Sequence, residues 1–144
     1  MSSVLLIEDD AASRLVMHNR LRDLGFEVTV AENGAVGLLE ARDRNFARLV
    51  VDAALDTGVT GLEVCRRLKQ LPGAAGVPMV LIARHAASRD EIHKGYEAGC
   101  DAFVTKSELP LLEDVLRALL RTKSIHDELA RQNRGLEDRA RRQE

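Results

Sequence analysis

The stretch VLLIEDDAASRLVMHNRLRDLGFEVTVA, residues 4–31, decides the fold because a strand, a helix and a second strand follow one another in it. The apolar runs at 4–7 and 28–31 are rich in branched side chains and short enough for buried strands. Residues 12–24 repeat apolar side chains at helical spacing, and Gly25 follows where a helix would end. This stretch therefore predicts one β-α-β unit.

The same alternation continues along the rest of the chain. Further strands are expected at RLVVDA (48–53), VPMVLIA (77–83) and AFVT (102–105), and helices at 34–44, 61–71, 88–98 and 109–121. Asn33 and Gly99 occupy helix-cap and helix-end positions. Because parallel strands need a covering layer on both faces, strict alternation predicts a doubly wound α/β fold with a five-stranded parallel sheet.

Ionisable side chains stand at the ends of three predicted strands. Glu8 and Asp9 follow the first strand, Asp52 ends the third, and Lys106 follows the fifth. The carboxyl ends of parallel strands meet at one edge of a sheet, so these groups are expected to converge. Three carboxylates so close together repel one another, and a hard cation such as Mg²⁺ is the natural compensator.

This combination predicts phosphoryl chemistry. Asp52 is the candidate nucleophile, fixed from behind by the sheet and expected to be open in front, and Lys106 is the point charge for a phosphoryl oxygen. Taken singly these residues have simpler explanations, because Asp9 or Asp10 could merely cap the next helix and a lone lysine is usually solvated.

Three segments, VLLIEDD, VVDAALDTGVTGLEVCRRLK and YEAGCDAFVTK, resemble the bacterial two-component response-regulator receiver domain, and the resemblance covers residues 3–121. It implies a flavodoxin-like sheet of strand order 2-1-3-4-5. It also implies that Asp52 accepts a phosphoryl group from the phosphohistidine of a histidine kinase or phosphotransfer protein, and that the domain then switches conformation to control an output domain or partner. Such a domain is a phosphoacceptor with self-catalysed phosphotransfer and autodephosphorylation rather than an enzyme.

The resemblance also implies individual roles at the site. Asp9, Asp52 and the backbone carbonyl of Ala54 would ligate Mg²⁺ directly, whereas Glu8 would act largely through water. Phe103 would be the switch aromatic, and Ala83 stands at the position of the switch hydroxyl.

Several residues depart from the family pattern. The acceptor loop, residues 52–61, is one residue longer than usual, and Asp56 stands where proline is common. Ala83 lacks the threonine or serine hydroxyl that follows the phosphoryl group, and Ser107 replaces the proline that usually follows Lys106, which predicts a looser lysine loop. These departures favour one alternative, an atypical receiver that docks or dimerises without phosphorylation.

The sequence predicts two parts, a receiver at 1–121 and a helical linker or coiled-coil extension at 122–144. The extension has no proline, its only glycine is Gly135, and polar Asn133 falls on an otherwise partly apolar heptad seam. We therefore expect a homodimer through this helix, with a solvated helix ending near Gly135 as the alternative. The output domain is expected to be absent from this sequence.

Composition and motifs exclude several classes. No apolar run approaches the roughly 18 residues of a membrane span, so a cytoplasmic protein without membrane contact is expected. Residues 1–120 carry 14 basic and 18 acidic side chains, which disfavours nucleic-acid binding. Cys65 and Cys100 lack metal-type spacing and are expected to be buried small hydrophobes.

Two other functions share this fold class. A nucleotide- or flavin-binding module would need a GxGxxG or GxxxxGK[ST] motif, and the sequence contains neither. A metal-dependent phosphohydrolase would want a second acid two residues after the nucleophile, where this chain has Ala54.

Overall fold

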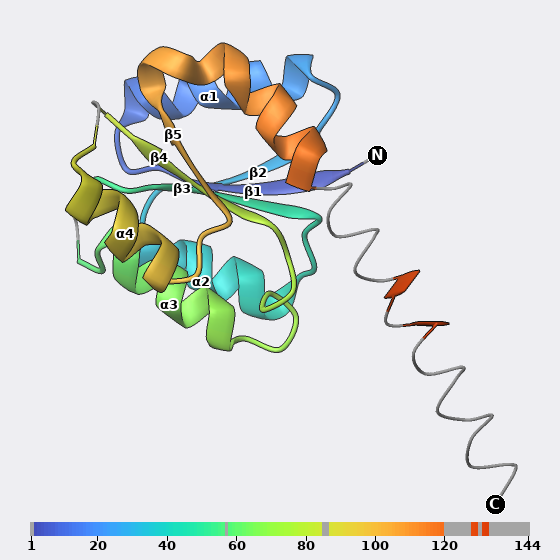
Figure 1. Ribbon diagram of the computed structural model, residues 1–144. Helices are drawn as coiled ribbons and strands as arrows, with labels where there is room; N and C mark the ends of the chain where they lie inside the picture. Colours follow the sequence, from blue (N-terminus) through green and yellow to red (C-terminus); the bar gives the residue numbers. More distant parts are fainter. Residues whose placement is uncertain (1, 57, 85–86, 120–127, 130, 133–144) are drawn as a thin grey trace, which may run out of the picture.

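The computed structural model describes residues 2–56, 58–84, 87–119, 128–129 and 131–132. Its centre is a five-stranded parallel sheet of order β2-β1-β3-β4-β5, which confirms the predicted order (Figure 1). The strands are β1 (Ser3–Ile7), β2 (Glu27–Ala31), β3 (Arg48–Asp52), β4 (Met79–Ala83) and β5 (Ala102–Thr105).

The helices alternate with the strands as the sequence predicts. They are α1 (Ala11–Asp23), α2 (Gly34–Asp43), α3 (Gly61–Gln70) and α4 (Arg89–Glu97), followed by the 3₁₀-helix η1 (Lys106–Leu111) and α-helical residues 112–119. Asn33 caps α2 as predicted, because its side chain accepts a hydrogen bond from the Val36 N–H. Gly25 and Gly99 follow α1 and α4 at φ 93° and 109°, a backbone region that favours glycine.

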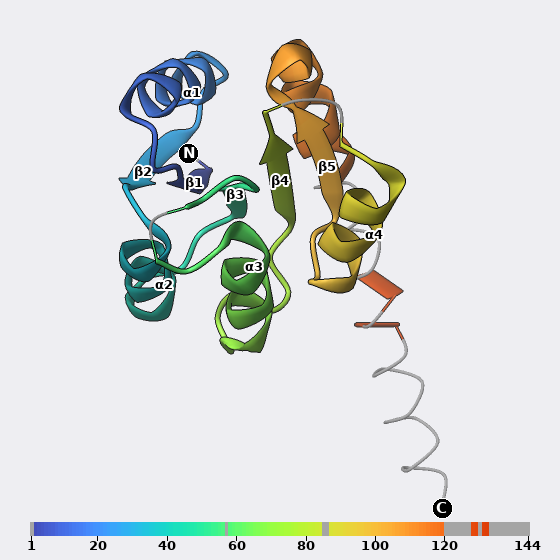
Figure 2. The ribbon, with the colours of Figure 1, turned by 90° about the vertical axis from the view of Figure 1, so that its left-hand side faces the viewer.

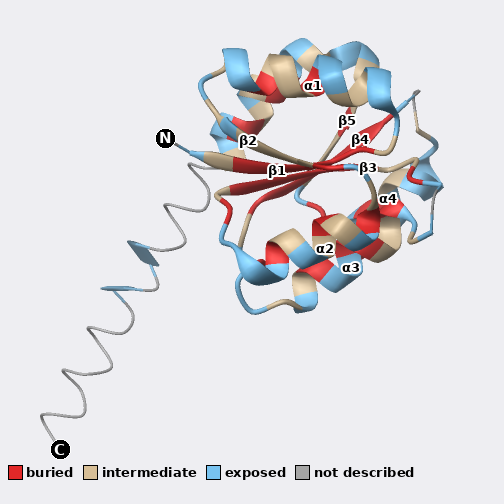
Figure 3. Ribbon diagram, turned by 180° about the vertical axis from the view of Figure 1, so that it is seen from behind, coloured by how far each residue is buried: buried red, intermediate tan, exposed pale blue. Residues whose placement is uncertain are grey.

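Helices cover both faces of the sheet (Figures 1 and 2). Helix α1 and residues 112–119 lie on one face, where Met17, Leu21, Leu112 and Leu116 pack on β-strand side chains. Helices α2 and α3 cover the other face, with α4 beside β5, and the central strands are buried between the layers (Figure 3). Each connection leads the chain back to the amino edge of the sheet, so all five strands run in the same direction. The carboxyl ends of β1, β3, β4 and β5 therefore lie together at the opposite edge.

The last predicted helix differs from the structure at its start. An α-helix was expected from Leu109, whereas η1 occupies Lys106–Leu111 and the α-helical residues begin at 112. Pro110 lies inside η1, and its missing N–H and fixed φ suit a first turn better than a helix interior. Most of the predicted extension 122–144, including Asn133 and Gly135, lies outside the described residues.

Two further expectations can be compared with the structure. Cys65 and Cys100 are both free and buried in the core, as predicted, and burial raises the pKa of their thiols to about 12 and about 11. Among the residues that the structure describes, no helix has the length and apolar character needed to cross a bilayer.

Candidate functional site

The carboxyl edge of the sheet gathers three acidic side chains. Glu8 and Asp9 lie in the turn between β1 and α1, and Asp52 is the last residue of β3. One carboxylate oxygen from each lies within 4.8 Å of the other two. Glu8 and Asp52 are buried, and Asp9 is half-buried. The structure therefore brings together the three acids that the strand ends predicted.

Asp52 is buried at the end of β3. Its Oδ1 accepts a hydrogen bond from the Ala54 N–H at 3.0 Å, while its Oδ2 is buried and has no hydrogen-bond partner. Gly61, the first residue of α3, packs closely against the main chain of Asp52. A Cβ at position 61 would lie only 2.5 Å from the Asp52 carbonyl oxygen. The expectation of an acceptor open in front is wrong for this conformation, since Asp52 is only 1% exposed.

The pKa of the Glu8 carboxyl is strongly perturbed within the site. Burial, and then the neighbouring charge of Asp52, raise the pKa of the Glu8 carboxyl to about 7. Its Oε1 accepts hydrogen bonds from the Asp10 N–H at 3.3 Å and from Lys106 Nζ at 3.5 Å, whereas its Oε2 is buried without a donor. Glu8 and Asp52 thus each present one buried oxygen that only a proton or a cation can satisfy.

The lengthened acceptor loop is tied to the acidic turn. The Asp56 N–H donates a hydrogen bond to Asp9 Oδ2 at 3.0 Å, and Leu55 is buried in the core beneath α3. Thr60 ends the loop by capping α3 through the Glu63 N–H. The sequence did not predict this contact between Asp56 and Asp9, because Asp56 lies within a loop and its position is not set by the end of a strand.

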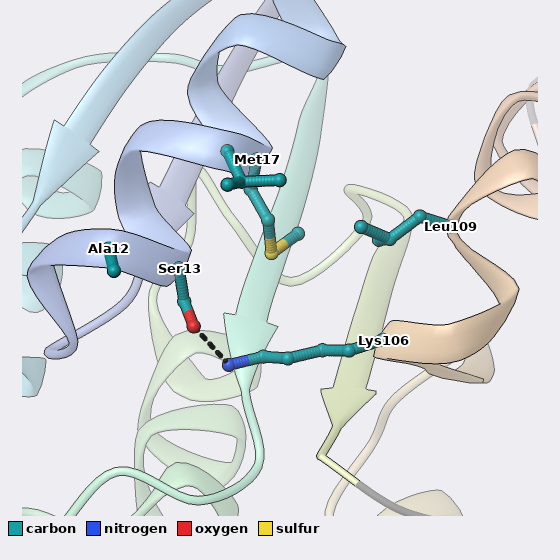
Figure 4. Close-up of a pocket in the computed structure, with 6 residues that line it drawn as sticks. Ala12, Ser13, Met17, Lys106 and Leu109 are labelled. Atoms are coloured by element: carbon teal, nitrogen blue, oxygen red, sulfur yellow. Dashed lines mark hydrogen bonds between the residues drawn. The ribbon is translucent and has the colours of Figure 1, made fainter.

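Lys106 reaches the acids from the opposite side of the edge. Its Nζ lies 3.5 Å from Glu8 Oε1, which confirms the predicted convergence, and 3.0 Å from Ser13 Oγ in the first turn of α1 (Figure 4). Sequence reasoning missed Ser13. The sequence offered one indication of its role, which is that Ser13 lies four residues before Met17. This spacing places both residues on the face of α1 that lies towards Lys106 and η1.

The switch positions lie along β4 and β5. Ala83 ends β4 opposite Thr105 and offers no hydroxyl at this point of the site. Phe103 packs against α4 at Gly95, where a Cβ would lie 3.1 Å from its ring. The Ala83 and Phe103 side chains share the α4 side of the sheet, because strand side chains alternate between faces.

Side-chain hydrogen bonds join the residues around Lys106 at the corner after β5. Thr105 Oγ1 lies 2.9 Å from Ser107 Oγ and donates a hydrogen bond to Glu108 Oε1 at 2.6 Å. No peptide bond of the described residues is cis, so Ser107 follows Lys106 through an ordinary trans bond. The looser lysine loop that Ser107 predicts therefore stays a prediction.

The donor set suits a hard divalent cation. Mg²⁺ prefers oxygen ligands and is commonly held by one or two carboxylates together with water or phosphate. Two of the cluster's buried oxygens lack partners, and Lys106 supplies a positive charge next to them. Such a site can bind a cation and can present a carboxylate and an ammonium to a phosphoryl group.

Comparison with known proteins gives a family match. A family model described as the response regulator receiver domain matches residues 4–121. The transcriptional regulatory protein AfsQ1 of Streptomyces coelicolor is 36% identical over 124 residues, which cover 84% of this chain and 52% of AfsQ1. The sensory transduction protein RegX3 of Mycobacterium tuberculosis is 35% identical over 106 residues, 74% of this chain and 44% of RegX3. The chain thus spans about half the length of these relatives.

Solved structures share the fold. The receiver domain of the sensor histidine kinase PA1611 from Pseudomonas aeruginosa PAO1, a structure with a magnesium ion coordinated in the active site cleft, superposes with a TM-score of 0.74 at 22% identity and covers 82% of this chain and 96% of that one. A CheY-like response regulator receiver domain protein from Methanospirillum hungatei gives a TM-score of 0.72 at 21% identity over 85% of this chain and 98% of that one. At these identities the similarity concerns the fold alone.

Proposed function

This chain belongs to the response regulator receiver domain family, and from that premise we propose that it is a phosphorylation-switched signalling domain whose acceptor is Asp52. The observation that carries the proposal is the unpartnered, buried Oδ2 of Asp52 in a cluster with Glu8, Asp9 and Lys106. A domain without phosphoryl chemistry would gain stability by losing such a cluster.

Glu8, Asp9, Asp52 and the Ala54 carbonyl would hold Mg²⁺. When bound, the ion would supply positive charge that offsets the carboxylates and the oxygens of a phosphoryl group. The unpartnered oxygens of Glu8 and Asp52 support this assignment, because once Glu8 has lost its proton they leave buried negative charge without a protein donor. The family resemblance makes Glu8 a ligand largely through water, and that role remains part of the proposal.

Phosphoryl transfer would proceed from the phosphohistidine of a histidine kinase or phosphotransfer protein in the cytoplasm. A carboxylate oxygen of Asp52 forms the new P–O bond as the donor's P–N bond breaks, and the electron pair of that bond stays on the imidazole. The Ala54 N–H holds the Asp52 carboxylate in one orientation, and the Lys106 ammonium neutralises a phosphoryl oxygen. Because Asp52 is 1% exposed, the loops around it must move apart for the donor to reach its carboxylate.

Hydrolysis of the acyl phosphate by water would reset the domain. We assign phosphoryl transfer and hydrolysis to the domain itself, with no separate catalytic base. The chain would then be a phosphoacceptor that catalyses its own phosphotransfer and dephosphorylation rather than a classical enzyme.

Output would depend on elements away from Asp52. Ala83 contributes no hydroxyl, so the phosphoryl group would bias conformation mainly through Lys106 and the surrounding loops, with weaker coupling to Phe103. We propose that the segment 122–144 pairs two copies as a helical dimer and passes a change in geometry to an output domain or partner. The sedimentation of residues 1–144 and 1–121, each with and without beryllofluoride, tests this, and a strict monomer for the longer chain refutes it.

The acceptor assignment is tested by intact mass. The full chain is incubated with acetyl phosphate in the presence and absence of Mg²⁺, beside Asp52→Asn and Asp56→Asn. We expect a single phosphoryl adduct that requires Mg²⁺, survives Asp56→Asn and disappears in Asp52→Asn. An adduct that persists in Asp52→Asn would refute the proposal, and no adduct in any sample would favour the phosphorylation-independent alternative.

A further inference from the structure

Ser13 lies in a part of the site that the proposed function leaves unassigned. It is the third residue of α1, and its N–H donates a 2.8 Å hydrogen bond to Oδ2 of the N-cap residue Asp10. A capped first turn fixes the backbone and so limits the directions in which the hydroxyl can point to a few rotamers. Its Oγ lies 3.0 Å from Lys106 Nζ (Figure 4).

The stem of Lys106 is also constrained. It lies along a groove of about 300 Å³ between α1 and η1, whose apolar lining includes Met17, Val16 and Leu109 (Figure 4). The lysine side chain is only 19% exposed. Apolar contact along the stem and a polar contact at the head together limit the rotamers of a side chain that is otherwise among the most flexible.

The donor count of the ammonium is informative. A lysine ammonium has three N–H donors and no acceptor. In the structure one donor goes to Ser13 Oγ and one to Glu8 Oε1, and no hydrogen bond joins Lys106 to Asp52 among the described residues. One donor therefore remains, and a phosphoryl oxygen on Asp52 would be its natural acceptor.

We propose that Ser13 is a positioning residue, which anchors the Lys106 ammonium so that its third N–H is free for an anionic oxygen on Asp52. This inference rests on the proposed function, because it concerns how that site recognises the phosphoryl group. Within the described part of the chain the Ser13 hydroxyl bonds to Lys106, and we assign its effect on the site to this contact. Without the hydroxyl, the ammonium keeps only its longer contact with Glu8 Oε1. Part of the entropy cost of ordering the Lys106 side chain must then be met when the phosphoryl group binds, which weakens that binding.

The test measures beryllofluoride binding to the full chain at saturating Mg²⁺ by fluorine NMR. Ser13→Ala should weaken beryllofluoride binding about three- to tenfold, the range expected for one hydrogen bond. Ser13→Thr, which keeps the hydroxyl, should stay close to wild type, and Mg²⁺ affinity without beryllofluoride should not change. Asn19→Ala on the same helix is the matched control. Alanine favours helix, so a loss in Ser13→Ala would not reflect an unfolded α1.

A double-mutant cycle separates positioning from a structural effect. In the Lys106→Ala background, Ser13→Ala should cause no further loss, because its only route to the site has been removed. An equal loss in both backgrounds, or unchanged affinity in Ser13→Ala alone, would overturn the inference.

A second measurement is independent of phosphoryl chemistry. The Lys106 ammonium should give a slowly exchanging NMR signal in the ligand-free wild type and in Ser13→Thr, and lose it in Ser13→Ala. If beryllofluoride does not bind wild type but this signal behaves as expected, the proposed function fails while the anchoring contact stands. If beryllofluoride binds but the signal does not depend on Ser13, the anchoring fails alone.

Discussion

Replacing Glu8 by glutamine should stabilise the metal-free protein at alkaline pH. The pKa of Glu8 rises from 4.5 to about 7 on folding, and at about 1.4 kcal/mol per pKa unit the charged carboxylate costs up to about 3 kcal/mol. Glutamine removes that charge. The glutamine carbonyl oxygen can still accept hydrogen bonds from the Asp10 N–H and from Lys106 Nζ. Its NH₂ group can donate to the unpartnered Oδ2 of Asp52.

The sign of the pH dependence follows from proton binding. Between pH 4.5 and about 7 the folded protein holds the Glu8 proton that the unfolded chain has released, so this residue makes stability fall as pH rises. Above that window the cost is constant. The stability difference between Glu8→Gln and wild type should therefore be small near pH 4.5 and grow to about 1–3 kcal/mol by pH 8.

Urea unfolding in the presence of a chelator, at several pH values between 5 and 8, measures this difference. Glu27→Gln, at an exposed position of β2, is the matched control and should show no such trend. Adding Mg²⁺ at pH 8 should stabilise wild type more than Glu8→Gln, because the ion can replace the missing proton. A difference between Glu8→Gln and wild type that does not vary with pH would refute the account of Glu8.

Three further predictions concern other parts of the chain. Lys106→Ala should retain Mg²⁺ affinity by calorimetry yet lose most beryllofluoride binding, and unchanged beryllofluoride binding would contradict its assigned role. Arg48→Met should raise the free energy of unfolding by about 1 kcal/mol, because the buried guanidinium has two nitrogens without partners, and a clear loss of stability in urea would count against this. Gly61→Ala should lower the free energy of unfolding by about 2 kcal/mol or more, because its Cβ would lie 2.5 Å from the Asp52 carbonyl oxygen. The same displacement should reduce the labelling of Asp52 by acetyl phosphate. A wild-type melting temperature for this variant would refute the packing argument.

The fold could be predicted because its signals are local and periodic. Short branched runs mark the strands, and amphipathic spacing with caps such as Asn33 marks the helices. The acid cluster followed from the same reasoning, because a residue at the carboxyl end of a parallel strand has its position set by topology. Glu8, Asp52 and Lys106 were predicted in this way.

The missed features depend on side chains that meet only after folding. Nothing in the sequence indicated that Asp52 would be covered, or that Ser13 would hold Lys106. Arg48 was read as the first residue of a strand, yet it is 3% exposed and stacks over the Phe26 ring at 4.9 Å. Burial lowers the pKa of its guanidinium, and the flexible apolar stem of arginine, rather than its charge, allows this position.

The central claim is that Asp52 and no other residue carries the phosphoryl group, and locating the modification tests it most directly. The phosphorylated full chain is reduced with borohydride, which converts an aspartyl phosphate to homoserine, and the peptides are sequenced by mass spectrometry. We expect homoserine at position 52 only, in a yield that depends on Mg²⁺ during labelling. Homoserine at position 9 or 56, or a phosphoryl group retained on a histidine, would contradict the account.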